Sequence, residues 1–417
     1  MKTLLIYPNN PAQFSLPHSI GQISSLLKKS GDEVRLFDST LYGIEGKTDD
    51  DRRADLGQIK PFEKKYIKHT DMVEDFSALV TDFNPDRLMI TFVDNTVENG
   101  FKLLSSMDHH VYTVAGGVSV TLNSERFHNN MIDVAWEGTA IEYLFPAKEI
   151  EDVFDDWTIF EENRLYRPMD GRYYKTIPLL TTYGCPYSCG FCCAPSLRKN
   201  FGTRNKDMDF VIKELDFQIE THNPEFIYIS SETLLSSPRK DLKKFANAYA
   251  KYNLPFWCQT HVNSINEEKI KMLKDMNCHR VALGIESGNE KYRKQMLKKH
   301  FTNDRAIKVF ELLAKYNVKA ASNNIVGFPL EDMSCMEDTL ALNRKLYKIM
   351  GESLQVNCYI YQPFYGTTLR DVCVSNNLII AEPDTVQGGP VVSNPYVSNK
   401  KIIQFRDNFY NEVTKTH

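Results

Sequence analysis

The sequence predicts an α/β protein in which a Rossmann-like, doubly wound parallel sheet is followed by a partial (β/α)6 barrel of the TIM type. Two observations carry this prediction. Short apolar runs alternate with amphipathic helical segments in both halves of the 417-residue chain, a pattern typical of parallel sheets with helical crossovers. A polar connector separates the halves. We therefore expect a first domain at 1–150, a linker at 151–178, a barrel at 179–376 and a C-terminal extension at 377–417.

The first half alternates between expected strands and expected helices. The strands are expected at 4–7, 34–37, 87–91, 111–115 and 134–136. The helices are expected at 19–28, 72–82 and 97–107. In the first helix Ile20, Ile23 and Leu27 recur at helical spacing, and Gly31 is the expected C-cap. Residues 41–69 are charged and lack periodicity, so we expect an insertion or lid that is disordered unless a neighbour packs against it.

The second half shows the same alternation with greater regularity. Its strands are expected at 179–182, 226–229, 256–260, 280–284, 319–326 and 354–361. Helices are expected at 207–221, 240–252, 267–275, 291–297, 304–316 and 337–349, with one more from residue 368. Because TIM-type barrels carry their chemistry on the loops at the carboxyl ends of the strands, we expect the functional residues there. The tail, residues 384–417, is expected to cap the barrel or to shape a substrate cavity.

Composition and charge argue against several classes of protein. With 42% hydrophobic and 25% charged residues, the chain has the composition of an ordinary globular protein. A formal net charge of −4 argues against a general nucleic-acid-binding surface. The one dense basic run, Lys291 to Lys299, is interpreted as a solvated helix face. No apolar stretch suits a membrane span or a signal peptide, and nine cysteines then favour a reducing compartment, the cytoplasm.

The most informative residues are three closely spaced cysteines, Cys185, Cys189 and Cys192. The spacing C-x3-C-x2-C supplies three thiolates from one loop, one fewer than a fully ligated [4Fe–4S] cluster requires. One iron then stays open and can chelate a small molecule through an amine and a carboxylate. The alternatives are a zinc site, for which Cys193 could be the fourth ligand, or a set of buried thiols. We interpret Cys193 itself as a small buried hydrophobic residue.

This loop, with Phe191 directly before the last cysteine, resembles the signature loop of the radical S-adenosylmethionine (SAM) enzymes. The resemblance implies a [4Fe–4S] cluster on Cys185, Cys189 and Cys192, whose reduction cleaves SAM to methionine and a 5′-deoxyadenosyl radical. It further implies that Phe191 packs over the adenine of SAM.

Other loops of the expected barrel extend the resemblance. Residues 284–288 read Gly-Ile-Glu-Ser-Gly, a signature of the same family, and residues 323–329 match its N-x-I-x-G-x-P pattern. The resemblance implies a set of SAM-binding residues from these loops: Phe191, Glu232, Gln259, His261, Glu286, Asn324 and Gly327. For Gln259 and His261, contact with the substrate or a buried structural role stays open.

The first domain resembles the cobalamin-binding domain that accompanies many radical SAM enzymes. The resemblance rests on residues 17–21, 116–122 and 133–138, and the segment 363–369 is typical of the same branch. It implies cobalamin contacts from one set of residues: His18, Gly116, Gly117, Glu137 and Gly138. The histidine motif that ligates cobalt in corrinoid carriers is absent, because Asp108 to His110 continues without its glycine and reads as a surface turn. The alternative is a plain Rossmann-like domain that binds a nucleotide or nothing.

Together the resemblances imply a cobalamin-dependent radical SAM methyltransferase that transfers a methyl group from methylcobalamin to an unactivated carbon. The expected partners are a small-molecule or peptide substrate and a flavodoxin- or ferredoxin-type reductant, with no nucleic acid. One alternative is a non-methylating enzyme of the same family, which catalyses ring formation, ring contraction or another radical rearrangement. Another is a corrinoid- and cluster-binding or electron-transfer protein whose radical function has decayed.

Overall fold

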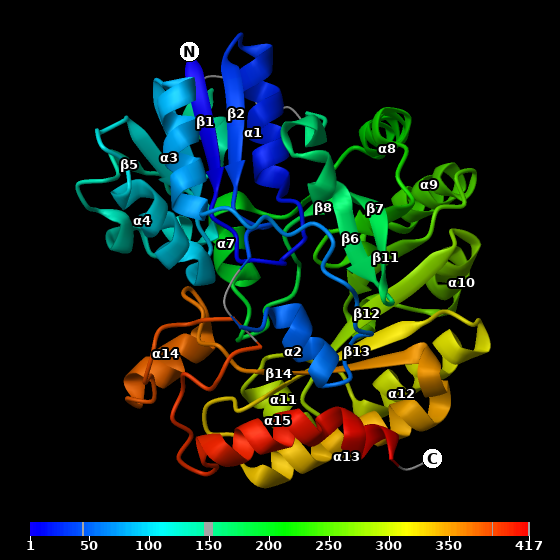
Figure 1. Ribbon diagram of the computed structural model, residues 1–417. Helices are drawn as coiled ribbons and strands as arrows, with labels where there is room; N and C mark the ends of the chain where they lie inside the picture. Colours follow the sequence, from blue (N-terminus) through cyan, green and yellow to red (C-terminus); the bar gives the residue numbers. More distant parts are fainter. Residues whose placement is uncertain (44–45, 146–152, 386, 416–417) are drawn as a thin grey trace. The chain divides into compact units, whose positions relative to one another are not determined.

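The computed structural model describes residues 1–43, 46–145, 153–385 and 387–415. The expected domain boundary at 150/151 lies outside the described residues. The chain forms two compact units (Figure 1). We call them the N-terminal unit, which comprises Met1–Asp50, Phe62–Tyr173 and Lys199–Phe201, and the barrel unit, which comprises Asp51–Pro61, Tyr174–Arg198 and Gly202–His417. Among the described residues, no helix has both the length and the apolar composition that a membrane span requires.

The N-terminal unit contains the parallel sheet that the sequence predicts. Its strands are β1 (Lys2–Tyr7), β2 (Glu33–Asp38), β3 (Arg87–Thr91), β4 (Thr113–Gly116) and β5 (Val134–Ala135), in the order β2-β1-β3-β4-β5 with every pair parallel. Its longer helices are α1 (His18–Lys29), α3 (Met72–Phe83) and α4 (Val97–Ser105). The direction of winding reverses between β1 and β3, and doubly wound sheets bind ligands outside the carboxyl ends of the strands at such a point.

The apolar periodicity explains these elements. In α1 the buried residues include Ile20, Ile23 and Leu27. The C-cap is Ser30 rather than the expected Gly31, which follows it in the left-handed conformation at a φ of +86°. The core of the unit packs the strand residues Leu4 and others against the helices; its fully buried members include Leu4, Ile6, Phe76, Leu88, Phe92 and Leu103.

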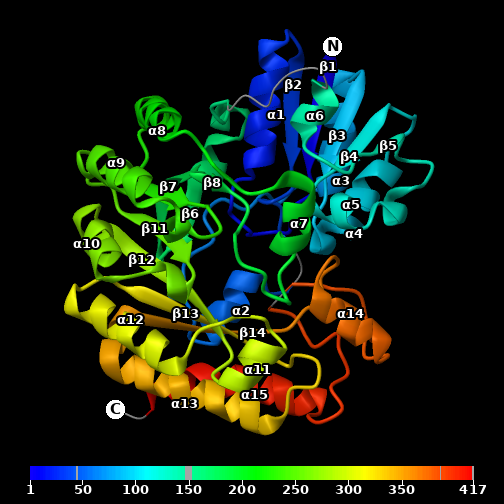
Figure 2. The ribbon, with the colours of Figure 1, turned by 180° about the vertical axis from the view of Figure 1, so that it is seen from behind.

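The barrel unit contains six parallel strands with helices on the outside, which confirms the partial (β/α)6 barrel. The strands are β7 (Arg172–Leu179), β10 (Phe226–Ile229), β11 (Phe256–Thr260), β12 (Cys278–Glu286), β13 (Ala320–Val326) and β14 (Leu354–Ile360). The outer helices are α8 (Met208–His222), α9 (Arg239–Ala250), α10 (Glu267–Asp275), α12 (Asn303–Lys315) and α13 (Met333–Met350) (Figures 1 and 2). The strand order is β14-β13-β12-β11-β10-β7, and β6 (Tyr166–Met169) extends the β7 edge.

The first barrel strand differs from the sequence prediction. It runs from Arg172 to Leu179, whereas we expected a linker up to 178 and a strand from 179. Residues Thr182–Tyr183 form β8 instead, which pairs antiparallel with β9 (Arg204–Asn205). The polar residues at the start of β7 hid its strand character, because Arg172, Tyr173 and Lys175 interrupt the apolar run.

Strand register separates two faces of the barrel sheet. Cys258, Val281 and Ser322 lie on the helix-covered face and are fully buried. The alternate strand residues lie on the opposite, interior face, where the members that retain some exposure include Tyr228, Trp257, Gln259, Arg280, Gly284, Asn323, Ile325, Gln355 and Tyr359. The interior therefore carries aromatic and carboxamide side chains rather than an apolar filling.

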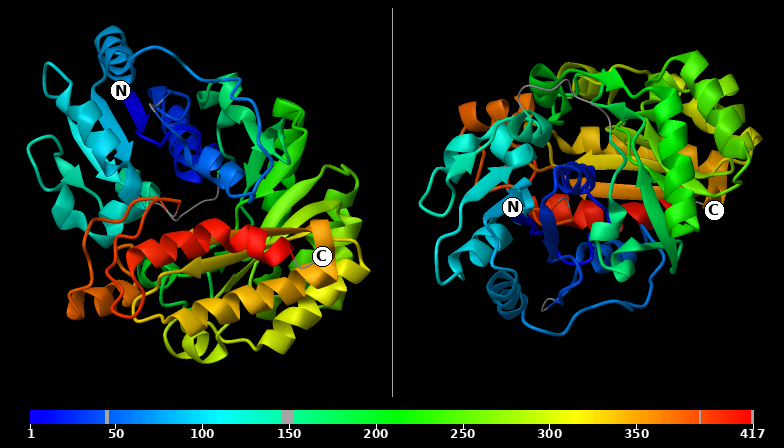
Figure 3. Two further views of the ribbon diagram at one scale, coloured as in Figure 1. Left: turned by 60° about the horizontal axis from the view of Figure 1, so that its bottom comes forward. Right: turned by 90° about the horizontal axis from the view of Figure 1, so that it is seen from above.

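Two segments cover the edge strand β14. Residues 51–61 of the expected insertion, which include most of α2 (Asp49–Asp55), belong to the barrel unit, and the Gln58 amide donates to the carbonyl of Cys358 at 2.9 Å. The helix α15 (Asn399–Thr414) lies beside α13 (Figure 3), where Arg344 donates to the carbonyl of Glu412 at 2.8 Å. Covering an edge in this way prevents its unpaired backbone groups from pairing with another chain.

Candidate active site

The cysteine loop leaves the sheet after β7 and is fixed at its base by Ser231. The Ser231 hydroxyl is fully buried and accepts from the backbone N–H groups of Thr181 and Thr182 at 2.9 and 3.2 Å. Loops of this kind need a fixed base, because the ligands must hold their geometry without a regular backbone ladder. Ser231, which follows β10, therefore has a structural role.

Arg198, on the helix α7 (Ala194–Phe201) that follows the cysteines, holds the first half of the loop. Its guanidinium donates to the carbonyls of Cys185 and Tyr187 at 2.8 and 3.1 Å, and to the Ser188 hydroxyl at 2.8 Å. A planar guanidinium can bind several acceptors at once in fixed directions. No sequence pattern points to this residue, since two of its three partners are backbone oxygens.

Gly190 holds the second half. Its N–H donates to the carbonyl of Leu297, and its own carbonyl accepts from Leu369 N–H, both at 2.9 Å. A Cβ at this position would lie 2.9 Å from the Thr368 hydroxyl and 3.1 Å from the Met296 carbonyl oxygen. Close approach of backbone to backbone therefore requires glycine between Cys189 and Cys192.

The three thiols lie close enough to influence one another. Burial raises the pKa of Cys189 to about 11 and also raises the pKa of Cys185. A hydrogen bond with the thiol of Cys193, followed by burial, raises the pKa of Cys192 well above its ordinary range. Without metal the thiols are therefore protonated at neutral pH, and binding iron would displace their protons. Cys193 is half-buried and engaged, which differs from the expected inert core residue.

These residues fit a cubane cluster. Three thiols from one fixed loop match the donor set of a [4Fe–4S] cluster with one open iron. Burial raises the pKa of both Cys185 and Cys189, and the positive charge of Lys299 partly offsets this rise by favouring the thiolates. Among the residues that the structure describes, no three His, Cys, Asp or Glu side chains are arranged to hold a single metal ion. This does not bear on a cubane, in which each cysteine binds a different iron.

Glu286 occupies an unusual backbone position at the end of β12. Its φ of +63° is costly for a residue with a side chain, and a register shift separates it from Gly284. The carboxylate bends back over Gly284, where a Cβ would overlap it and would lie 2.5 Å from Lys299 Nζ. Strained backbone that the surrounding structure maintains is typical of functional sites.

Lys299 forms a buried ion pair with Glu286, with 2.8 Å between Nζ and Oε1. Burial alone would lower the pKa of the ammonium, but the Glu286 carboxylate raises it above its ordinary value, so Lys299 is a cation. Lys299 also lies 5.8 Å from the centre of the Phe191 ring, which in turn packs against Phe328. The sequence interpretation of Lys299 as part of a solvated face is wrong, because only tertiary packing reveals its burial.

Glu232 follows β10, and its charge raises the pKa of both Cys185 and Cys192. The side chain remains accessible to solvent, while the protein around it partly desolvates the carboxyl and raises its pKa. An accessible carboxylate beside three thiols can accept hydrogen bonds from the ammonium group of a ligand held by the open iron.

His261 packs against the cysteine loop through Tyr187. Its ring stacks on Tyr187 with 3.8 Å between centroids, and its Nδ1 accepts from Asn263 N–H at 3.1 Å. Burial, helped by the charge of Lys299, lowers its pKa to about 3, so the ring is neutral. Of the two alternatives left open for His261, the geometry favours the structural one, whereas Gln259 faces the barrel interior.

Asn324, which was expected to bind SAM, does not face the barrel interior. Asn324 is fully buried on the helix-covered face, where its amide donates to Asn343 Oδ1 and to the Asn357 carbonyl. Asn323 faces the interior instead. Gly327 has a φ of +75°, and a Cβ there would lie 2.9 Å from Ile402. The packing of α15 therefore explains this glycine without a ligand.

Interior side chains form an oriented row of hydrogen bonds that ends at Asn323. Arg280 donates to Gln355 Oε1 at 2.6 Å, Gln355 Nε2 to Asn357 Oδ1 at 3.1 Å, and Asn357 Nδ2 to Asn323 Oδ1 at 2.8 Å. Because a guanidinium can only donate, it fixes the orientation of each following carboxamide. The row leaves the Asn323 Nδ2 group as a donor on the interior face. At the other end of the row, Trp257 lies in register with Arg280 on the neighbouring strand, and its ring stacks on that of Tyr228 at 4.6 Å between centroids.

In the N-terminal unit, the residues expected to bind cobalamin gather at the carboxyl ends of the strands. A Cβ at Gly116 would meet no atom within 4 Å, while Gly117 adopts a φ of +100° and its Cβ would lie 2.6 Å from the Phe92 carbonyl oxygen. Two exposed valines, Val93 at 41% and Val118 at 37%, follow β3 and β4 at the same edge. Open space above a glycine and exposed apolar side chains suit a flat, largely apolar face such as a corrin ring.

The other candidates at this edge already have partners. His18 opens α1 and bonds through Nδ1 to Asp155 Oδ2 at 2.6 Å. Glu137 is exposed and accepts a hydrogen bond from Ser124. Trp136 donates to the Thr139 carbonyl at 2.8 Å, and a Cβ at Gly138 would lie 2.8 Å from the Trp136 indole nitrogen. Asp108 to His110 is an exposed turn, in agreement with the sequence interpretation.

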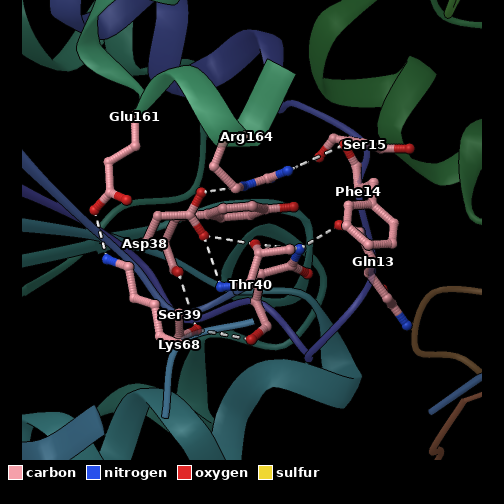
Figure 4. Close-up of polar contacts among 11 residues, drawn as sticks. Gln13, Phe14, Ser15, Asp38, Ser39, Thr40, Lys68, Glu161 and Arg164 are labelled. Carbon is pink, nitrogen blue, oxygen red and sulfur yellow. Dashed lines mark hydrogen bonds and ion pairs between the residues drawn. The ribbon is translucent and has the colours of Figure 1, made fainter. Parts of the chain in front are cut away.

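A buried ion pair fixes the loop after β1 (Figure 4). Arg164 is 2% exposed; its Nε donates to Asp38 Oδ2 at 2.5 Å and its Nη1 to the Phe14 carbonyl at 3.2 Å. The other carboxylate oxygen of Asp38 accepts from the N–H of Thr40 at 2.9 Å. Asp38 ends β2 and Phe14 lies in the loop that leads to α1, so the pair immobilises one side of the strand edge at the switch point.

Comparison with known proteins defines the class. Residues 179–342, which include the cysteine loop, match the family model of the Radical SAM superfamily. These residues therefore form a radical SAM domain. The fold of the chain is that of the cobalamin-dependent radical SAM enzymes, as the following structures show.

The chain is similar in structure to OxsB, a cobalamin-dependent S-adenosylmethionine radical enzyme solved with aqua-cobalamin and SAM. The alignment covers 94% of this chain and 64% of OxsB, with a TM-score of 0.62 and 15% identity. The radical SAM methyltransferase TsrM from Kitasatospora setae, solved with cobalamin and a [4Fe–4S] cluster, gives a TM-score of 0.62 and 14% identity over 90% of this chain and 75% of that one. In sequence, the chain is 23% identical to the uncharacterized methyltransferase PH0819 of Pyrococcus horikoshii over 344 residues, 73% of each.

Proposed function

We propose that this chain is a cobalamin-dependent radical SAM enzyme that methylates an unactivated carbon of a small-molecule or peptide substrate. The observation that carries the proposal is the cysteine loop, fixed by Arg198 and Gly190 beside the Glu286–Lys299 pair at the carboxyl ends of the barrel strands. The relatives named as methyltransferases support the choice of reaction.

Cys185, Cys189 and Cys192 would hold the cluster, and the carboxyl edge of the N-terminal sheet would hold cobalamin. When bound, these groups supply the electron that cleaves SAM to methionine and a 5′-deoxyadenosyl radical, and the methyl group that is transferred. Glu232 would bind the ammonium of SAM, and the Glu286 oxygen not bonded to Lys299 would accept from the ribose hydroxyls. The Asn323 donor and the Trp257 ring would orient the substrate in the barrel interior.

The cellular location that suits this chemistry is a reducing one, and we propose the cytoplasm. All nine cysteines lie within the described residues and form no disulfide. A cluster with an open iron also requires thiolates that stay reduced.

The test is anaerobic reconstitution with iron, sulfide and hydroxocobalamin, followed by SAM and dithionite and mass-spectrometric detection of 5′-deoxyadenosine. We expect 5′-deoxyadenosine from the wild-type protein and from the control C335A, whose cysteine lies on α13. We expect none from C185A, C189A or C192A. Absence of 5′-deoxyadenosine from a protein with a full cluster would contradict the proposal.

The visible spectrum of the same sample tests the cobalamin part. Bound corrinoid together with 5′-deoxyadenosine supports the full proposal. Normal 5′-deoxyadenosine without bound corrinoid would leave a radical SAM enzyme and remove methyl transfer from cobalamin. A product that carries the SAM methyl group, with two SAM consumed per turnover, separates methylation from a radical rearrangement.

A further inference from the structure

The basic run at residues 291–299 divides into buried and exposed cations. Arg293 is fully buried, and Lys299 forms the ion pair with Glu286. Lys291, Lys294 and Lys298 are exposed on and directly after α11 (Glu290–Gln295). We call these three residues the α11 patch. The solvated-face interpretation therefore holds for only part of the run, and the exposed part needs its own explanation.

The α11 patch is joined to the cysteine loop through the backbone. The carbonyl of Leu297, directly before Lys298, accepts from Gly190 N–H at 2.9 Å. Gly190 lies between Cys189 and Cys192, which would bind two of the irons. The neighbouring Met296 carbonyl oxygen would lie 3.1 Å from a Cβ at Gly190. The backbone directly before Lys298 is thus hydrogen-bonded to the cluster-binding loop.

The lysines of the patch lack acidic partners among the described residues, whereas the nearby acids are engaged. Glu290 accepts from the N–H of Asn303 at 2.6 Å, and Asp338 accepts from the Asn289 amide at 2.8 Å. Some exposed lysines elsewhere do pair with acids, as Lys244 does with Asp209 and Lys315 with Glu267. Three uncompensated cations form a positive field in a chain whose formal net charge is −4.

We propose that a small acidic electron-donor protein docks on the α11 patch and delivers one electron to the cluster through the Gly190 loop. The inference rests on the proposed function, because SAM cleavage consumes an electron that the chain does not supply. The donor is oxidised by one electron, and that electron passes through the cluster to the sulfonium. The S–C5′ bond then breaks, leaving a lone pair on the methionine sulfur and the unpaired electron on C5′. A general negative charge on the chain repels an acidic protein, so a local positive patch decides where it binds.

The test compares two charge-reversed variants of the cluster-loaded protein. The first carries K291E, K294E and K298E. The matched control carries K345E, K348E and K400E, which make the same charge change at exposed positions of α13 and α15. The probe is a flavodoxin kept reduced by its NADPH-dependent reductase, and dithionite serves as the small reductant. Readouts are the rate of cluster reduction by stopped-flow absorbance, the Kd of the flavodoxin, and 5′-deoxyadenosine.

We expect the α11 variant to lose about tenfold or more in flavodoxin-driven reduction rate and in flavodoxin affinity at low salt. Its dithionite-driven 5′-deoxyadenosine formation should match that of wild type and control. The difference between wild type and variant should shrink as salt is added, because screening removes the steering. Equal flavodoxin affinity and reduction rate in the two variants would overturn the docking surface. Failure of the wild type with dithionite would instead overturn the proposed function.

Discussion

At the scale of single residues, the Glu286–Lys299 pair is the clearest case of a functional group held by its surroundings. Both side chains are under 10% exposed, and the Glu286 backbone adopts a φ of +63°. Breaking a buried pair by removing one partner costs more than replacing both, since it leaves an uncompensated charge. This asymmetry makes the energetic role of the pair measurable apart from any reaction.

We expect K299M to destabilise the apoprotein by about 3 kcal/mol, and the double variant K299M/E286Q to be closer to wild type. The measurement is the urea midpoint of unfolding. The control is K315M, which removes the exposed Lys315–Glu267 pair of 2.9 Å and should shift the urea midpoint far less, because solvent screens an exposed pair. If the double variant is as unstable as the single one, an unpaired carboxylate is not the cause.

His261 gives a pH-dependent prediction. Burial lowers its pKa to about 3 in the folded protein, against an ordinary value of about 6.5 when unfolded. The unfolded chain therefore binds more protons in this range, and the contribution of the neutral ring to stability is complete above pH 6.5 and is lost as the pH falls towards 3. Between pH 6.5 and 5 the loss should be about 2 kcal/mol.

The measurement compares the urea midpoints of wild type and H261F at pH 7 and pH 5. Phenylalanine keeps a ring against Tyr187, which stacks at 3.8 Å, but cannot titrate. H261F should therefore lose less stability than wild type over this interval. H300F, at an exposed histidine, should follow the wild type. Parallel pH profiles for wild type and H261F would show that His261 titrates normally.

At the scale of elements, the two glycines at the end of β4, Gly116 and Gly117, have different structural roles. Gly117 serves the local backbone, while Gly116 leaves space that no atom of the protein fills within 4 Å. We expect G116V to leave the thermal unfolding of the apoprotein unchanged and to weaken hydroxocobalamin binding by about tenfold or more, because its side chain would occupy the space proposed for the corrin. The measurement is a spectrophotometric titration with hydroxocobalamin.

The control for this variant is G389V, at another glycine whose Cβ would meet nothing within 4 Å. It belongs to the barrel unit, whereas the strand edge belongs to the N-terminal unit. Unchanged cobalamin affinity in G116V would place the corrin elsewhere.

The elements that the sequence predicted are those with local signals. All five strands of the first sheet and five of the six barrel strands were expected near their observed positions, because apolar runs and helical periodicity are short-range features. The strand Arg172–Leu179 was missed because polar residues interrupt it. The cysteine loop was found from the spacing of its cysteines, and the Gly-Ile-Glu-Ser-Gly segment from its resemblance to a family signature.

The parts of the site that the sequence did not reveal depend on tertiary contacts. Lys299 resembles its exposed neighbour Lys298 in sequence, and only the fold buries one and exposes the other. The burial of Asn324 on the helix-covered face has the same origin, because successive strand residues such as Asn323 and Asn324 point to opposite faces. Arg198 was silent because backbone carbonyls are its principal partners.

At the scale of the whole molecule, residues 51–61 belong to the barrel unit, although the residues on either side of them in the sequence belong to the N-terminal unit. Gly57 adopts a φ of +71°, and a Cβ there would lie 2.5 Å from the Tyr410 ring on α15. Gln58 bonds to the edge strand β14. The segment thus ties two pieces of the barrel unit together at positions 300 residues apart in sequence.

We expect G57A to release residues 51–61 from the barrel unit, because the new methyl group collides with Tyr410 as well as straining the backbone. Hydrogen exchange followed by mass spectrometry should show faster exchange in β14 and α15, with no change in β1 to β4. G46A is the matched control: its φ of +95° imposes similar backbone strain, of about 1 kcal/mol, but its Cβ meets nothing within 4 Å. If the two variants exchange alike, strain rather than packing holds the segment. If G57A also speeds exchange in β1 to β4, the two units do not open independently, and the segment contributes to the stability of both.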